Sequence, residues 1–140
     1  MIGEEIRIVV YENPIPKGRP RVALRGKFPI VYTPKATREA EDQFLYKAMD
    51  KRPEAPLEGP LSVRICFFKL KPKSYSKKVT HWVQKPDLDN LVKLVLDALN
   101  KVFYVDDSQV VELCCSKHFG DVARTEVTIR KVEDDSEDEV

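Results

Sequence analysis

Four of the five aspartates and one of the two lysines between residues 87 and 107 have types and spacing suited to phosphate chemistry. Asp87 and Asp89 are separated by a single residue, Lys93 follows on the same stretch, and Asp106 and Asp107 come later. Carboxylates held close together repel one another unless a positive charge neutralises them. A hard divalent cation does so, and Mg²⁺ commonly takes one or two carboxylates together with water and substrate phosphate. Such an ion would polarise a phosphoryl group and lower the pKa of an attacking water.

The residues that follow the first aspartate predict an amphipathic helix. Apolar residues recur at spacings of three and four from Leu88 to Val102 and form one stripe. Pro86 cannot lie inside a helix and aspartate is a favoured capping residue, so we expect the helix to begin between Asp87 and Asp89. Residues two apart on a helix point in different directions. With Asp87 in extended backbone and Asp89 in the first turn, however, both carboxylates could turn to one point.

A turn after this helix could bring a third carboxylate to the first two. Residues 102–105 are short and apolar, and the next three, Asp106-Asp107-Ser108, have turn chemistry. Each feature also has an ordinary interpretation, in which Asp89 caps the helix or pairs with Lys93, and the acidic turn is only a turn. The conjunction of all of them favours a metal site.

The stretch resembles the signature of the RusA family of Holliday junction resolvases. The resemblance rests on Asp87-Leu88-Asp89-Asn90-Leu91, Lys93, Asp97-Ala98-Leu99, Asp106-Asp107 and Gln109. It implies a small homodimeric endodeoxyribonuclease that resolves four-way junctions by paired symmetric nicks, in DNA recombination and repair, with Mg²⁺ as cofactor and Mn²⁺ as a possible substitute. It also implies that Asp87, Asp89 and Asp107 are catalytic and bind metal, and that Lys93 is a catalytic lysine.

The resemblance leaves the second acid pair open. The connection after the helix is slightly shorter than in the family, so either member of the pair could point into the site. We favour Asp107 and keep Asp106 as a further metal ligand. Glu112 follows closely, but strand alternation predicts it on the solvent face.

Length and composition predict one domain, residues 1–132, followed by an acidic and disordered tail, residues 133–140. The chain has no apolar run near the roughly 18 residues of a membrane span and no signal-peptide pattern. Three cysteines, an odd number without metal-ligand spacing, suggest reduced thiols. We therefore expect a soluble, cytoplasmic protein without a membrane partner. The sequence also lacks a glycine-rich phosphate loop and any Ser-His or Cys-His arrangement, so we expect no organic cofactor.

The charge of the predicted domain favours a polyanionic partner. Six of the 23 acids lie within residues 133–139, so residues 1–132 hold 24 bases and 17 acids, a net charge of +7. The bases gather in a proline-rich segment after the first strand and in a loop before the acidic motif. The expected DNA-binding residues are Lys17, Arg19, Arg21, Lys71, Lys73, Lys77, Lys78 and Lys85. Tyr75 and Trp82 could stack on an unpaired base or simply pack at the edge of the loop.

Alternating and periodic segments predict an α+β domain with a mostly antiparallel mixed sheet, two packed helices and, by resemblance, the RusA fold. We expect strands at 5–12, 29–33, 61–70, 109–119 and 123–132, and a first helix at 35–49. A turn at residues 25–27 closes one hairpin, and Gly120-Asp121 is expected to close a second between the last two strands.

The expected substrate also bears on the oligomeric state. A four-way junction needs two related cuts, which a two-fold homodimer supplies. Alternative functions are a metal-dependent nuclease for other branched nucleic acids or a DNA-structure-binding protein without catalysis.

Overall fold

The computed structural model describes residues 5–133, in which two α-helices accompany six strands. The elements are β1 (Glu5–Val10), β2 (Arg21–Arg25), β3 (Phe28–Tyr32), α1 (Lys35–Ala48), β4 (Leu61–Leu70), α2 (Leu88–Leu99), β5 (Val110–Gly120) and β6 (Arg124–Lys131). Short 3₁₀ turns follow α1 and precede β5, at Met49–Lys51 and Asp107–Gln109. The predicted α+β class is confirmed.

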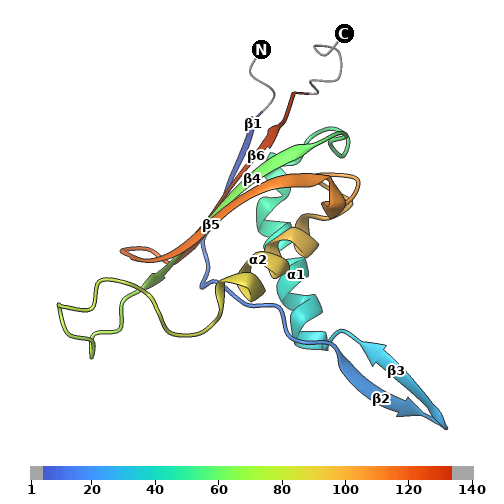
Figure 1. Cartoon of the computed structure of the whole chain (residues 1–140), viewed down its shortest axis with the longest axis horizontal. Helices are drawn as coiled ribbons and strands as arrows, with labels where there is room; N and C mark the ends of the chain where they lie inside the picture. The colour runs from blue at the N-terminus through green and yellow to red at the C-terminus, as the bar shows by residue number, and fades with distance from the viewer. Residues whose placement is uncertain (1–4, 134–140) are drawn as a thin grey trace.

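Four strands form one twisted sheet in the order β1-β6-β4-β5 (Figure 1). β6 pairs antiparallel with both β1 and β4, whereas β4 and β5 run parallel. The sheet is therefore mixed and mostly antiparallel, as expected. β2 and β3 form a separate antiparallel ribbon that projects from the rest of the chain.

The prediction of a hairpin between the last two strands is wrong. β4 lies between β5 and β6, so the connection at residues 121–123 passes across the end of β4. Gly120 allows this close passage, because a Cβ at this position would lie 3.1 Å from a ring atom of Phe68 on β4. The sequence indicates a change of direction at this point but does not reveal which strands pair.

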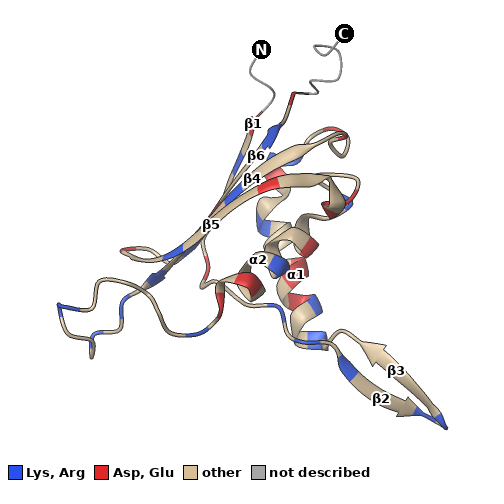
Figure 2. Cartoon of the chain, in the orientation of Figure 1, with Lys and Arg blue, Asp and Glu red and all other residues tan. Residues whose placement is uncertain are grey.

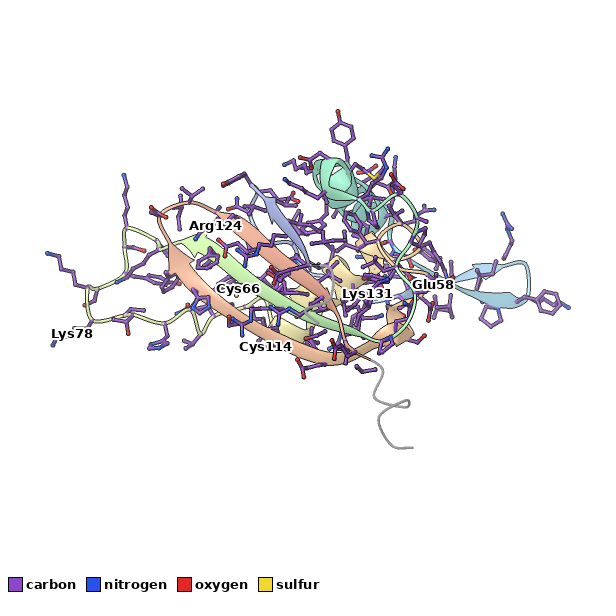
Figure 3. The ribbon with its side chains drawn as sticks, turned by 90° about the horizontal axis from the view of Figure 1, so that it is seen from above. Glu58, Cys66, Lys78, Cys114, Arg124 and Lys131 are labelled. Atoms are coloured by element: carbon purple, nitrogen blue, oxygen red, sulfur yellow. The ribbon has the colours of Figure 1, made fainter. Side chains whose placement is uncertain are left out.

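Both helices pack on the same face of the sheet (Figure 1). Along β4, Val63, Ile65 and Phe67 are buried against them, while the alternate residues lie on the opposite, open face. Each fully buried side chain of this size contributes roughly 1.5–3 kcal/mol of burial energy. Cys66, Cys114 and Arg124 belong to the open face (Figure 3).

Most predicted boundaries agree with the structure to within a few residues. β4 matches residue for residue, α1 ends one residue early, and β2 is a strand that the predicted element order did not contain. Residues 102–105 form a turn in which Phe103 and Tyr104 are fully buried. The predicted acidic tail lies outside the described residues apart from Glu133. None of the helices within residues 5–133 is long and apolar enough to cross a membrane.

Candidate active site

The backbone at the start of α2 has the conformation that the sequence predicted. Asp87 is extended, with φ −69° and ψ 145°, and α2 begins at Leu88, which places Asp89 in the first turn. Asp87 makes no side-chain cap, although its carbonyl accepts the amide of Leu91 at 3.2 Å. One carboxylate oxygen of Asp89 accepts the amide of Asn90 at 2.9 Å. Within residues 5–133, the carboxylates of Asp87 and Asp89 form no ion pair.

A groove of about 530 Å³ lies between α2 and β5 and collects the candidate catalytic side chains. Asp89, Lys93 and Asp97 line it from α2, and Asp107 lines it from the turn before β5. The remaining lining is apolar, with Leu88, Val92, Leu96, Leu113 and Cys115. Residues far apart in the sequence are thus brought to one surface, because the turn after α2 folds back alongside the helix.

The two acids of the second pair have different surroundings. Asp106 caps the 3₁₀ turn, where its carboxylate accepts the Ser108 amide at 3.1 Å and pairs with Lys101 at 3.2 Å. The hydrogen bonds from Ser108 and the Lys101 ammonium lower the pKa of Asp106 to about 2. Asp107, which lines the groove, makes no such contact in residues 5–133. This arrangement favours Asp107 as the inward member and gives Asp106 a structural task.

Gln109 fixes this turn to a distant loop. Its side-chain oxygen accepts the amide of Asp106 at 2.8 Å, and its amide nitrogen donates to the carbonyls of Leu57 and Gly59, both at 2.9 Å. Tyr104 lies behind the turn and donates its hydroxyl to the carbonyl of Leu96 on α2 at 2.6 Å. Burial, with the nearby carboxylates, raises the pKa of Tyr104, so its hydroxyl stays protonated. These contacts hold the turn that carries Asp107 in a fixed position next to α2.

Asp97 also lines the groove, although the sequence indicated it only as part of the motif and not as a site residue. Its carboxylate lies 2.6 Å from the ammonium of Lys17 and 3.4 Å from that of Lys93. The signal was present, because Asp97 follows Lys93 by four residues and lies on the same helix face. The partner from the N-terminal segment could not have been inferred from that spacing.

Lys17 therefore differs from the expectation of a base aimed at DNA. Its ammonium is mostly buried between α1 and α2 and contacts Glu41 at 2.8 Å as well as Asp97. Burial by itself lowers the pKa of Lys17, but the hydrogen bonds that its ammonium donates to Asp97 and Glu41 outweigh burial and raise the pKa. Its contribution to DNA binding stays a prediction.

Asp87 faces a second groove, of about 750 Å³, on the other side of the helix start. Arg19, Lys85 and Asn90 line this groove with it. The structure thus brings Asp89 and Asp107 to one groove and Asp87 to the adjacent one. Among residues 5–133, no three acidic, histidine or cysteine side chains are close enough to share a metal ion. The set of three carboxylates stays a prediction.

Comparison with known proteins decides the family. The family model described as Endodeoxyribonuclease RusA matches residues 12–130, which is most of the chain. The chain belongs to the RusA family. It is also 36% identical over 137 residues to a protein of Bacillus subtilis (strain 168) called Uncharacterized protein YqaN, covering 91% of this chain and 96% of that protein. The motif that suggested RusA lies inside the matched range.

RusA nucleases generally depend on divalent metal, and the groove offers a donor set that suits one. Asp89 and Asp107 supply carboxylate oxygens on a shared surface, whereas Asp97 is already paired with two lysines. Two carboxylates completed by water and phosphate are a usual environment for Mg²⁺. An ion held there would neutralise the two carboxylates and polarise a bound phosphate.

The basic loop of this RusA chain reaches the groove of Asp87, which its Lys85 lines. It spans residues 71–87, carries Lys71, Lys73, Lys77, Lys78 and Lys85, and projects from the end of β4 opposite to the ribbon (Figures 1 and 2). Lys78 lies at its far end (Figure 3). All of these lysines except Lys71 are exposed.

Trp82 anchors the loop instead of offering its ring to a base. Only 3% of its surface is exposed, and the ammonium groups of Lys69 and Lys117 lie 4.9 and 5.0 Å from its ring centre. Lys117 also donates to the carbonyls of Gln84 and Pro86 at 2.8 and 3.0 Å. The suggestion that Trp82 stacks on a base is wrong for this conformation. Tyr75 packs edge-on against Phe119.

Glu112 lies on the opposite face of the sheet from the groove. Its carboxylate accepts the hydroxyl of Ser62 at 2.7 Å on the open face. The alternation of β5 thus separates Glu112 from the carboxylates near α2, as predicted.

Proposed function

We propose that this RusA protein is a Mg²⁺-dependent endodeoxyribonuclease that resolves four-way DNA junctions as a homodimer, by one nick in each of two opposed strands. The observation that carries the proposal is the groove shared by Asp89, Lys93 and Asp107, which the fold assembles from two separate segments. Membership of an endodeoxyribonuclease family supports the reaction type.

Each groove residue has a distinct part in this proposal. Asp89 and Asp107 would hold the Mg²⁺, for which Mn²⁺ can substitute, and Asp87 would complete the set from the adjacent groove. The ammonium of Lys93, whose side chain is 63% exposed, would donate to the phosphate oxygens as negative charge develops on them. The rest of the groove is lined by apolar side chains, which would strengthen these interactions once bound DNA covers the groove.

The basic surfaces would position the DNA backbone without reading its sequence. Lys85 and Arg19 lie in the groove of Asp87, next to the proposed site of cleavage. The lysines of the 71–87 loop extend this surface outward. A homodimer would place a second copy of both grooves in matching orientation, which symmetric cleavage of a branched substrate requires.

The test compares a synthetic four-way junction with a linear duplex of the same sequence, with and without Mg²⁺. We expect paired nicks on the junction that need the metal and disappear in Asp89→Asn. Asp121→Asn, which changes a carboxylate 95% exposed outside both grooves, is the matched control and should cut as the parent does. Equal cutting of the linear duplex would refute junction resolution, and sedimentation as a monomer at micromolar concentration would refute the dimer.

A further inference from the structure

The ribbon of β2 and β3 has no packing partner among the described residues. Every residue of both strands is exposed, including Leu24 at 76% and Phe28 at 75%. An isolated two-stranded ribbon is marginally stable in water. Its projection away from the sheet and helices (Figure 1) therefore indicates that it works against another molecule.

The base of the ribbon is fixed to both helices. Its entry segment places the amide of Lys17 2.9 Å from the carbonyl of Asn90 on α2. The amide of Gly18 donates to the hydroxyl of Thr37 on α1 at 3.1 Å. These contacts, with the ion pairs of Lys17, hold the root of the ribbon next to the groove of Asp87.

The two faces of the ribbon differ in chemistry. Residues directly opposed in an antiparallel pair lie on the same face. Arg21 opposes Tyr32 and Arg25 opposes Phe28, which makes one face basic and aromatic. The other face is apolar and consists of Val22, Leu24, Pro29 and Val31. Near the tip, Leu24 and Phe28 therefore project on opposite faces.

The charge of this part of the chain favours a polyanion over a second copy of the protein. Residues 13–38 contain seven Lys and Arg residues and no Asp or Glu. In Figure 2 the ribbon is blue at its tip and its root and carries no red. Two such ribbons would repel each other, whereas phosphate groups would neutralise them.

We propose that the β2–β3 ribbon is a DNA-binding arm that lies in a groove of the duplex leading away from the cleaved strand. This inference rests on the proposed function, which supplies branched DNA as the molecule that the arm binds. Five residues per strand extend about 17 Å, and a two-stranded ribbon fits a DNA groove. Arg21, Arg25 and Lys27 contact backbone phosphates. Leu24 and Phe28 make apolar contacts with the sugars and base edges of the groove.

The experiment measures binding of a labelled four-way junction by anisotropy in EDTA, over a range of NaCl concentrations. Arg25→Gln/Lys27→Gln removes two charges at the tip. Lys51→Gln/Arg52→Gln is the matched control, because it removes two charges at the opposite end of α1. Each lost phosphate contact lowers the slope of log affinity against log salt by about 0.9. We expect the slope to fall by roughly 1.8 in the ribbon variant and to stay at the parental value in the control.

A second set of substrates locates the contact. Junctions with progressively shortened arms should lose the difference between parent and ribbon variant once the duplex no longer reaches the tip. Equal slopes for the ribbon variant and its control would overturn the proposal. So would a ribbon effect that persists on the shortest arms.

Two further measurements complete the test. The first separates the proposal for the arm from the proposed nuclease function, and the second distinguishes a DNA-binding arm from a dimerisation element. Binding in EDTA does not depend on cleavage, so a parent that binds but never cuts would refute the proposed function and leave the arm intact. Leu24→Ser/Val31→Ser should keep the oligomeric state of the parent in sedimentation. A dimer that becomes a monomer in this variant, with an unchanged salt slope, would assign the ribbon to a second copy of the chain.

Discussion

The ammonium of Lys17 lies 2.6 Å from a carboxylate oxygen of Asp97 and 2.8 Å from one of Glu41. A residue of the N-terminal segment thereby joins α1 to α2. Since Asp97 also lies 3.4 Å from Lys93, the same carboxylate connects the ribbon's entry segment to the proposed catalytic lysine.

Replacing this lysine should destabilise the fold. Lys17→Met leaves two mostly buried carboxylates without their common partner, which costs roughly 1–3 kcal/mol in the free energy of unfolding. Urea unfolding followed by circular dichroism measures the change. Lys93→Met is the control, because its exposed ion pair with Asp97 contributes less than about 1 kcal/mol. Equal stability of the two variants would contradict the structural role of Lys17.

The stabilisation by Lys17 should depend on pH at the alkaline end. The pKa of Lys17 is raised in the folded state, since its bonds to Asp97 and Glu41 outweigh burial. A raised pKa stabilises the fold fully below the unfolded value of about 10.4, and the contribution disappears as pH rises through the folded pKa. The stability difference between parent and Lys17→Met should be constant from pH 6 to 9 and shrink only above about pH 10.4. A difference that already shrinks near neutral pH would argue against this cause.

Lys93→Ala should separate catalysis from binding. Loss of one group that stabilises developing charge typically slows the chemical step by about 10²–10³-fold. Junction affinity in EDTA should change little, because the other bases remain. Single-turnover cleavage at saturating protein measures the step directly. Cutting at the parental rate would remove Lys93 from the proposed machinery.

The two acids of the second pair should behave differently. Asp107→Asn should abolish cleavage with little effect on stability, whereas Asp106→Asn should keep most of the activity and lower the melting temperature. Asp106 has a pKa of about 2 in the folded state, below the unfolded value of about 3.9, so its stabilisation is present above that value and is lost as pH falls toward 2. The melting difference between Asp106→Asn and parent should therefore vanish in strong acid. Loss of cleavage in Asp106→Asn alone would make Asp106 the inward residue.

Trp82 should report the anchoring of the basic loop. As the only tryptophan and a buried one, it should show blue-shifted emission and weak acrylamide quenching, unaltered when DNA binds. Lys117→Met leaves the carbonyls of Gln84 and Pro86 without their donor, so quenching should rise and junction cleavage should fall. Lys131→Met, in the other long strand beside β4, is the control. Strong quenching of Trp82 by DNA in the parent would restore the stacking hypothesis.

Local signals in the sequence predicted most of the elements. Apolar alternation predicted β4 without error. The proline and aspartates before α2 predicted a start within residues 87–89, and the helix begins at Leu88. The same local chemistry located the extended backbone at Asp87. These features depend on a residue and its near neighbours, which a sequence displays directly.

Relations between distant segments were not predictable in this way. Alternation identified β5 and β6 as strands but said nothing about β4 lying between them. The bases of the proline-rich segment were expected to bind DNA, yet Lys17 turns inward because Asp97 and Glu41 offer it two carboxylates. The contacts that favour Asp107 over Asp106 as the inward acid, the cap of Asp106 on the Ser108 amide and its pair with Lys101, are likewise not visible in the sequence.

The position of β6 has a consequence for how the chain folds during synthesis. Within residues 5–133, β1 pairs with no strand other than β6, which lies between β1 and β4 and opposes Arg130 to Glu5. Since β6 follows all the other strands in the sequence, a ribosome must produce almost the whole domain before β1 can pair with it. Until then the apolar sides of β1, β4 and both helices lack a complete sheet. A nascent RusA chain should need protection from aggregation until residues 124–131 have emerged.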